Sequence, residues 1–323
     1  MKVGVFAVLF GDMKLEAVME YIKAAGCDAV EIGTGCYPGG ALCPLDELLA
    51  DKNRAQGWMK QITGRGLEIS ALSCHGNPLH PNPAIAKEHD AIFRKTIELA
   101  SMLGIGTVVN FSGCPGDQPG AKYPNWVTCP WPTDFGEILN FQWNDVAIPY
   151  WKEINGVLKA KKVRVGLEMH PGFLVYNTET ALRLRESCGE QIGVNFDPSH
   201  LFWQGIDPVY SIRKLGEAGA IFHFHAKDCK IDEINSKTSG VLDTKSYTDE
   251  LHRTWIFRTI GYGHDAQIWK DMVSTLRLIG YDGALSIEHE DSLMTSREGL
   301  KKAVAFLRDV VINEPKGDAP WAR

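Results

Sequence analysis

VRVGLEMHPGF at residues 163–173 and IGVNFDPSHLFW at residues 192–203 are two apolar runs of the kind that form buried strands. The first run ends in Glu168 and His170, and the second ends in Asp197 and His200. Acids and imidazoles placed where a buried strand leaves the core are typical of a metal or catalytic centre. Such a centre needs further ligands, which we expect at the ends of other strands.

Short apolar or β-branched runs recur through the whole chain, and we expect each of them to be a strand. The eight runs are residues 2–10, 28–34, 67–74, 106–113, 163–170, 192–199, 220–228 and 283–291. Helix-like segments, with apolar residues three and four positions apart, lie between most of them, as at residues 14–26, 84–104, 144–162 and 265–280. Near-continuous apolar strands that alternate with helices predict a parallel sheet covered on both sides.

Eight such units in 323 residues predict an α/β protein with a single-domain (β/α)₈ barrel. A doubly wound sheet is the alternative, but no Gly-rich phosphate loop follows a strand to favour it. Two long interruptions, residues 114–143 after the fourth strand and residues 229–264 after the seventh, would lie on the carboxyl-terminal face of the barrel. Such barrels place their active sites on that face. The aromatic residues of the first interruption favour an ordered lid.

Composition narrows the class of protein. Lys and Arg total 34 against 40 for Asp and Glu, the net charge is −6, and no basic run stands out, which argues against nucleic acid as the partner. We find no signal peptide and no apolar stretch of the roughly 18–20 residues that a membrane span needs. The eight cysteines lack CxxC spacing and are expected to be reduced thiols. We therefore expect a cytoplasmic protein that does not bind a membrane.

Polar residues stand at the carboxyl ends of seven predicted strands. They are Glu31; His75; Asn110; Glu168 and His170; Asp197 and His200; His223, His225 and Lys227; and Glu288, His289 and Glu290. Each alone could be a satisfied buried group, as a lone core histidine such as His223 often is. Together, acids and imidazoles from four successive strands would bury several charges at one end of the barrel. Such burial is costly unless the charges are paired or bind a metal.

The alternation of side chains along a strand sharpens the choice of ligands. His223, His225 and Lys227 point to one face, and His225 is the ligating residue nearest the mouth. Glu288 and Glu290 also share a face, and Glu288 is preferred because it lies at the end of the apolar run. Three carboxylates and one imidazole suit a hard divalent ion, Mn²⁺, Mg²⁺ or Co²⁺, with Zn²⁺ also compatible.

Several motifs resemble one family. GLEMHPGF, NFDPSHLFW, HFHAKD and SIEHED, together with SCHGNPLHPNP after the third strand, resemble the sugar phosphate isomerase/epimerase group of the xylose isomerase-like TIM barrel superfamily. The resemblance covers nearly the whole chain and implies one such domain over residues 1–323. It implies one divalent metal ion, with Mn²⁺ favoured, held by Glu168, Asp197, His225 and Glu288, which agrees with the choice made from side-chain alternation.

The resemblance also implies an activity. Related ketose epimerases bind the metal to a carbonyl and a neighbouring hydroxyl, and two metal-binding glutamates, here Glu168 and Glu288, shuttle the proton through an enediolate. We therefore expect a metal-dependent sugar isomerase or epimerase. The residues expected to contact the substrate are His75, His170, His200 and Lys227. For His75 and His80, a purely structural turn in the His-Gly-Asn-Pro loop is the alternative.

Two other activities are weighed against this one. The endonuclease IV-like enzymes of the superfamily hold three zinc ions with extra histidines; His75 and His200 would fit, but Asn110 stands where a further histidine is needed. The chain also resembles the alpha subunits of C-glycoside deglycosidases, lyases that act on 3-oxo-glycosides with a small β-sandwich partner. Their base is expected to be a histidine near the lid, and residues 141–151 contain none. His75, His80 or His264 could take that role.

The sequence indicates the class of substrate but does not identify the substrate or the partners. Phosphate recognition needs cations at the mouth, and Lys227, Lys230 and Arg258 are the residues placed to serve. We therefore expect an unphosphorylated sugar or a 3-oxo-sugar derivative. The sequence leaves open a homo-oligomer or a small β-rich partner subunit.

Overall fold

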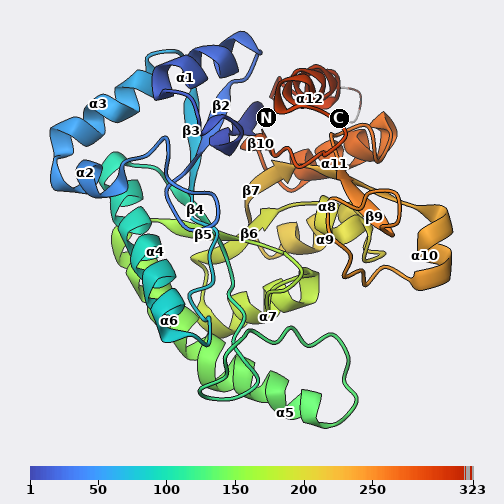
Figure 1. Ribbon diagram of the computed structural model, residues 1–323. Coiled ribbons are helices and arrows are strands. Elements are labelled where there is room, and N and C mark those ends of the chain that lie inside the picture. The colour runs from blue at the N-terminus through green and yellow to red at the C-terminus, as the bar shows by residue number, and fades with distance from the viewer. Residues whose placement is uncertain (316, 318–320, 322–323) are drawn as a thin grey trace.

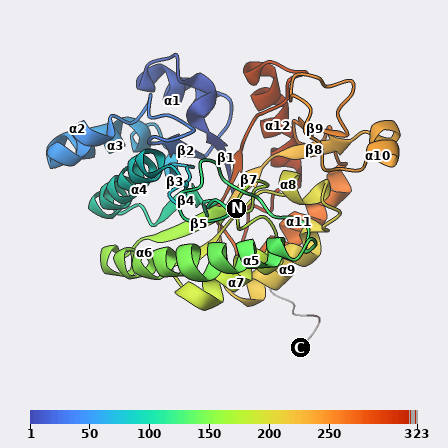
Figure 2. The ribbon, with the colours of Figure 1, turned by 60° about the horizontal axis from the view of Figure 1, so that its bottom comes forward.

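Eight of the apolar runs form parallel strands that pair side by side in a ring. In the computed structural model, which describes residues 1–315, 317 and 321, they close into a barrel in the order β1-β10-β7-β6-β5-β4-β3-β2 (Figures 1 and 2). The strands are β1 (Lys2–Phe6), β2 (Ala29–Gly33), β3 (Glu68–Ser73), β4 (Thr107–Phe111), β5 (Arg164–Glu168), β6 (Ile192–Phe196), β7 (Ile221–Ala226) and β10 (Ala284–Ile287). The closed ring confirms the predicted fold class and excludes the doubly wound sheet.

Helices surround the ring of strands. They are α1 (Leu15–Ala24), α2 (Leu45–Ala50), α3 (Lys52–Thr63), α4 (Pro83–Leu103), α5 (Asp134–Asn140), α6 (Ile148–Lys161), α7 (Thr178–Cys188), α8 (Ser199–Phe202), α9 (Pro208–Glu217), α10 (Glu233–Ser239), α11 (Ala266–Leu278) and α12 (Ser296–Val310). The helix α4 shows how the sequence sets their limits. The Asn82 side chain accepts a hydrogen bond from the Ala84 N–H at the start, and Gly104, with φ +73°, ends the helix in the left-handed conformation.

Several strands are shorter than predicted, and this places polar side chains just beyond the core. The first predicted strand ends at Phe6, and a 3₁₀ helix, η1 (Ala7–Phe10), follows it. The fifth ends at Glu168 rather than His170. Because parallel strands of a barrel all end at one rim, the residues at or just after these strand ends gather there.

The two long interruptions contain more regular structure than the sequence indicated. Residues 134–161 run without a break through α5, the π-helix η2 (Phe141–Ala147) and α6. The second interruption contains the antiparallel hairpin β8 (Asp228–Ile231) and β9 (Trp255–Arg258), with α10 at the edge of the molecule between them in sequence (Figures 1 and 2). None of the described helices is long and apolar enough to cross a membrane.

Candidate metal centre

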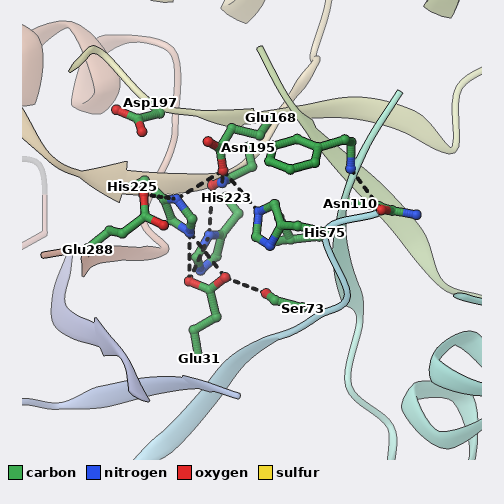
Figure 3. Close-up of polar contacts among 12 residues, drawn as sticks. Glu31, Ser73, His75, Asn110, Glu168, Asn195, Asp197, His223, His225 and Glu288 are labelled. Carbon is green, nitrogen blue, oxygen red and sulfur yellow. Dashed lines mark hydrogen bonds and ion pairs between the residues drawn. The ribbon is translucent and has the colours of Figure 1, made fainter. Parts of the chain in front are cut away.

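Four predicted ligands converge at the carboxyl-terminal rim of the barrel (Figure 3). Glu168 ends β5, Asp197 directly follows β6, His225 lies near the end of β7 and Glu288 directly follows β10. One potential ligand atom from each lies within 4.8 Å of those of the other three. The arrangement therefore offers one imidazole nitrogen and three carboxylate oxygens to a single point.

The orientation of His225 leaves one ring nitrogen facing the carboxylates. Its Nε2 donates to Glu31, at 3.1 Å from Oε1 and 2.9 Å from Oε2. Its Nδ1 lies 3.2 Å from Glu168 Oε2 and 3.2 Å from Glu288 Oε2, yet this buried atom has no hydrogen bond among the described residues. Metal-binding histidines are typically oriented in this way: one ring nitrogen faces the metal, and the other donates a hydrogen bond to a carboxylate.

Glu31 supports His225 from the side opposite the other carboxylates (Figure 3). Its side chain is fully buried and accepts hydrogen bonds from the hydroxyls of Ser73 and Ser286, the latter at 2.7 Å. Burial alone would raise the pKa of Glu31, but the charges on His225 and His223 outweigh it and hold the pKa at about 2. The sequence places Glu31 at a strand end but gives it no role, because its partner His225 comes nearly two hundred residues later.

The buried charges of the centre are mostly negative. Lys227 lies among the carboxylates, with Nζ 3.1 Å from Asp197 Oδ2 and 2.6 Å from Glu288 Oε2. Burial nevertheless raises the pKa of Asp197 to about 6, although the nearby Lys227 lowers it. Asp197 Oδ2 is also a buried atom that has no hydrogen-bond partner in the described part of the chain. A divalent cation fits these residues, because it would neutralise the carboxylates and supply a partner for both unbonded atoms.

Three side chains fix the carboxylate of Glu168. His75 Nε2 lies 2.9 Å from Oε2, Asn195 Nδ2 donates to Oε2 at 3.2 Å, and His200 Nε2 lies 3.1 Å from Oε1. Burial would raise the pKa of Glu168, but the nearby imidazoles of His200, His225 and His75 outweigh it and hold the pKa well below its ordinary value. Glu168 is therefore ionised at neutral pH and has a defined orientation.

A cavity of about 240 Å³ opens over Glu168 and Glu288. Three of the predicted substrate contacts, His75, His170 and Lys227, line it. The fourth, His200, is fully buried and contacts the carboxylates of Glu168 and Asp197 instead. Glu290, the less favoured of the two glutamates after the eighth barrel strand, also lines the cavity and lies 3.0 Å from Lys227 Nζ.

Other histidines singled out in the sequence lie away from this cavity. His80 Nδ1 accepts a hydrogen bond from the Asn82 N–H, and His264 Nδ1 lies 2.7 Å from Asp228 Oδ1. His223 is the core histidine that its sequence context suggests. Its two ring nitrogens lie 2.9 Å from Asn195 Oδ1 and 3.1 Å from Ser70 Oγ.

Hydrogen bonds to the backbone hold the loop after β4 in place. The buried Gln142 side chain donates to the backbone carbonyls of Pro115, Gly116 and Asn125. Trp126 meets Tyr176 edge to face, whereas Trp131 is three-quarters exposed. The residues that line the 240 Å³ cavity come from other described segments, so the lid expected at residues 114–143 does not contribute to the cavity wall.

Comparison with known proteins gives consistent matches. The sequence profile of the xylose isomerase-like TIM barrel family matches residues 19–310. The protein YfiH of Bacillus subtilis (strain 168) is 39% identical over 316 residues, which cover 96% of this chain and 99% of YfiH. A solved D-tagatose 3-epimerase-like protein shares the fold at 24% identity, with 96% of this chain and 97% of that chain covered and a TM-score of 0.62. The structure of IolI with a zinc atom matches at 20% identity, with 96% and 98% covered and a TM-score of 0.65.

Proposed function

Because the chain belongs to the xylose isomerase-like TIM barrel family, we propose that it is a divalent-metal-dependent sugar isomerase or epimerase. The convergence of Glu168, Asp197, His225 and Glu288 on one point carries the proposal. The shared fold of a D-tagatose 3-epimerase-like protein supports a sugar as substrate, and the zinc atom of IolI supports a metal at the centre. We favour Mn²⁺ because oxygen ligands predominate.

A bound divalent ion at this point would polarise a substrate carbonyl and acidify the adjacent C–H group. Glu168 and Glu288 are the proposed proton carriers. They come from β5 and from the end of β10, three positions apart in the ring of eight strands, so they approach the cavity from different sides. Epimerisation needs proton removal on one face of the substrate and return on the other, which two such carboxylates supply. Isomerisation through an enediolate needs one carboxylate that returns the proton to the neighbouring carbon.

The remaining cavity residues are proposed to orient the sugar. Lys227 can donate to a hydroxyl or carbonyl oxygen. His170 Nδ1 donates to the Pro171 carbonyl at 2.6 Å, and burial lowers the pKa of His170 to about 4. His170 is therefore neutral at pH 7, and its Nε2 can accept a hydrogen bond from a sugar hydroxyl. His75 fixes Glu168 and lies at the cavity wall, where it can contact the substrate as well.

One observation favours a second candidate function, that of a metal-dependent lyase on 3-oxo-glycosides. Of the three histidines considered as its base, His75 lines the cavity over the proposed metal ligands, whereas His80 and His264 have partners elsewhere. The nuclease alternative is less well supported. Asn110 Oδ1 accepts a hydrogen bond from the Gly76 N–H, which orders the loop of His75, and offers no imidazole to a further metal.

Exchange of substrate hydrogen with solvent tests the proposal directly. The Mn²⁺-loaded protein is incubated in D₂O with ketoses, sugar phosphates and 3-oxo-glycosides, and the C–H signal beside each carbonyl is followed by NMR. We expect exchange with at least one unphosphorylated compound, and product analysis then separates epimer, isomer and elimination product. Absence of exchange from every class would contradict the proposal.

A further inference from the structure

A second cavity, of about 350 Å³, adjoins the one over the proposed metal ligands. His170 and Glu290 line both cavities and therefore stand at the junction between them. The far walls of the second cavity include Tyr247 and Phe257, which belong to the segment after β7. The two cavities therefore lie next to each other, and a molecule bound at the centre that extends past these two side chains would enter the second.

The walls of the second cavity suit a ring. Tyr247 and Phe257 are stacked, with ring centroids 5.7 Å apart and an interplanar angle of 17°, and Ile256 adds apolar surface. Thr248 and Ser292 supply hydroxyls beside these apolar groups. Aromatic faces combined with a few polar groups are typical of sites that bind cyclic ligands.

The second cavity is built on ordered structure. Phe257 lies on β9 opposite Cys229 of β8. Its ring also faces the metal centre, with Lys227 Nζ 4.6 Å from its centroid and the His200 ring meeting it edge to face. The Arg253 guanidinium packs over Tyr247 at 4.3 Å. The wall therefore connects directly to the side chains of the centre.

We propose that the second cavity is a subsite for a second ring joined to the reacting sugar, so that the substrate is a glycoside or disaccharide rather than a free monosaccharide. The subsite proposal rests on the proposed function, which identifies the ring that reacts at the centre as a sugar. The cavity over the ligands, about 240 Å³, lies below the roughly 300–1,000 Å³ common for small-molecule sites. The adjoining space brings the site into that range. A monosaccharide would leave the exposed part of Tyr247, 55% of the residue, in water.

Matched compounds that differ only in the attached group test the subsite. The 3-oxo-glucosides carrying a methyl, a phenyl or a glucosyl group are compared, as are D-fructose and isomaltulose, a fructose that carries a glucosyl group. Two readouts are taken with the Mn²⁺-loaded protein, the rate of C–H exchange in D₂O and the dissociation constant by calorimetry. We expect binding of a two-ring compound to be about tenfold tighter than that of its one-ring partner.

Two variants locate the effect. Ser292→Trp fills the second cavity from an exposed turn, and we expect it to remove the advantage of the two-ring compounds over the one-ring compounds. Tyr247→Ala should reduce that advantage by removing one aromatic face. Ser239→Trp, which adds the same bulk at an exposed position on α10, is the matched control and should retain the preference.

The outcomes separate the two proposals. Equal affinity of the unmodified protein for one-ring and two-ring compounds overturns the subsite. A two-ring preference that persists in folded Ser292→Trp overturns it as well. If no compound exchanges but the two-ring preference in binding persists and is lost in Ser292→Trp, the proposed reaction is wrong and the subsite stands. Preference for phenyl over glucosyl identifies an aromatic aglycone, and the reverse identifies a second sugar; either supports the subsite.

Discussion

At the scale of single residues, the centre depends on which nitrogen of His225 faces the carboxylates. Glu31 holds Nε2–H with both oxygens, so Nδ1 is directed to the point that Glu168 and Glu288 share. Glu31 would thus affect a metal at the proposed centre only through His225. This makes it a positioning residue, whose effect differs from that of a ligand.

Replacement of Glu31 should therefore weaken metal binding without removing a ligand. We expect Glu31→Gln to raise the dissociation constant for Mn²⁺ by about 10- to 100-fold, because partners of metal-bound histidines contribute by that amount. The measurement is a calorimetric titration of protein first treated with chelator, with thermal unfolding as the check on folding. Glu68→Gln, at an exposed position on β3, is the control and should bind Mn²⁺ as the unmodified protein does. An unchanged constant in Glu31→Gln would refute the role.

Glu168 and Glu288 should be needed for turnover. We expect Glu168→Gln and Glu288→Gln each to reduce the rate of C–H exchange by at least about 100-fold, because an amide cannot carry the proton. Metal content is measured alongside, since both residues are also proposed ligands. Normal exchange in either variant would place the base elsewhere.

The four converging residues could be predicted from the sequence, but the contact of Glu31 with His225 could not. Alternation places His223, His225 and Lys227 on one face, and His225 is the ligating residue of that face nearest the mouth. The end of an apolar run singles out Glu288, so both choices follow from local pattern. The link between Glu31 and His225 depends on β2 and β7 standing across the ring with β1 and β10 between them. That arrangement is set by strand pairing, which no local pattern of the sequence specifies.

At the scale of elements, the hairpin β8–β9 was the main feature that the sequence did not predict. Its strands have four residues each and pair across a separation of more than twenty residues, so neither is distinct from a loop by periodicity. The eight barrel strands were predictable because each is a mostly apolar run and most of them are followed by a helix-like segment. The hairpin that was not predicted contributes Ile256 and Phe257 to the wall of the second cavity.

Asp291 ties this hairpin to the segment after β10, and its removal should loosen the wall. The buried carboxylate accepts from the Thr259 and Leu293 N–H groups, at 2.8 and 3.0 Å, and from Arg258 Nε at 3.1 Å. Burial would raise the pKa of Asp291, but these donors outweigh it and lower the pKa below its ordinary value. A carboxylate with a depressed folded-state pKa stabilises the fold above the unfolded pKa of about 3.9 and loses that effect as pH falls through the folded value.

We therefore expect Asp291→Asn to lower the free energy of unfolding by about 1–3 kcal/mol at pH 7. The difference from the unmodified protein should shrink as pH falls below about 4. Denaturant unfolding at several pH values measures both effects. Asp46→Asn, which removes an exposed partner of Lys95, is the control and should change the free energy by no more than about 0.5 kcal/mol. A cost for Asp291→Asn that does not vary with pH would contradict the assigned ionisation.

At the scale of the whole molecule, the barrel turns eight separate strand ends into one surface. Residues from position 31 to position 290 meet there, although they are distributed over most of the chain. Such a ring concentrates negative charge, and Lys227 offsets only part of it. A bound cation should therefore stabilise the entire fold, because the unfolded chain disperses the same ligands.

Metal removal tests this coupling of site and fold. Elemental analysis of protein purified without chelator should find about one divalent ion per chain, and chelation should lower the unfolding temperature. A metal present at 100 times its dissociation constant adds about 2.7 kcal/mol to the free energy of unfolding, so restoring Mn²⁺ should reverse the loss. In Asp197→Asn, which replaces a proposed ligand carboxylate directly after β6 by an amide, the same addition should have a much smaller effect. Protein that contains no metal and unfolds identically with and without Mn²⁺ would show that the four residues serve another purpose.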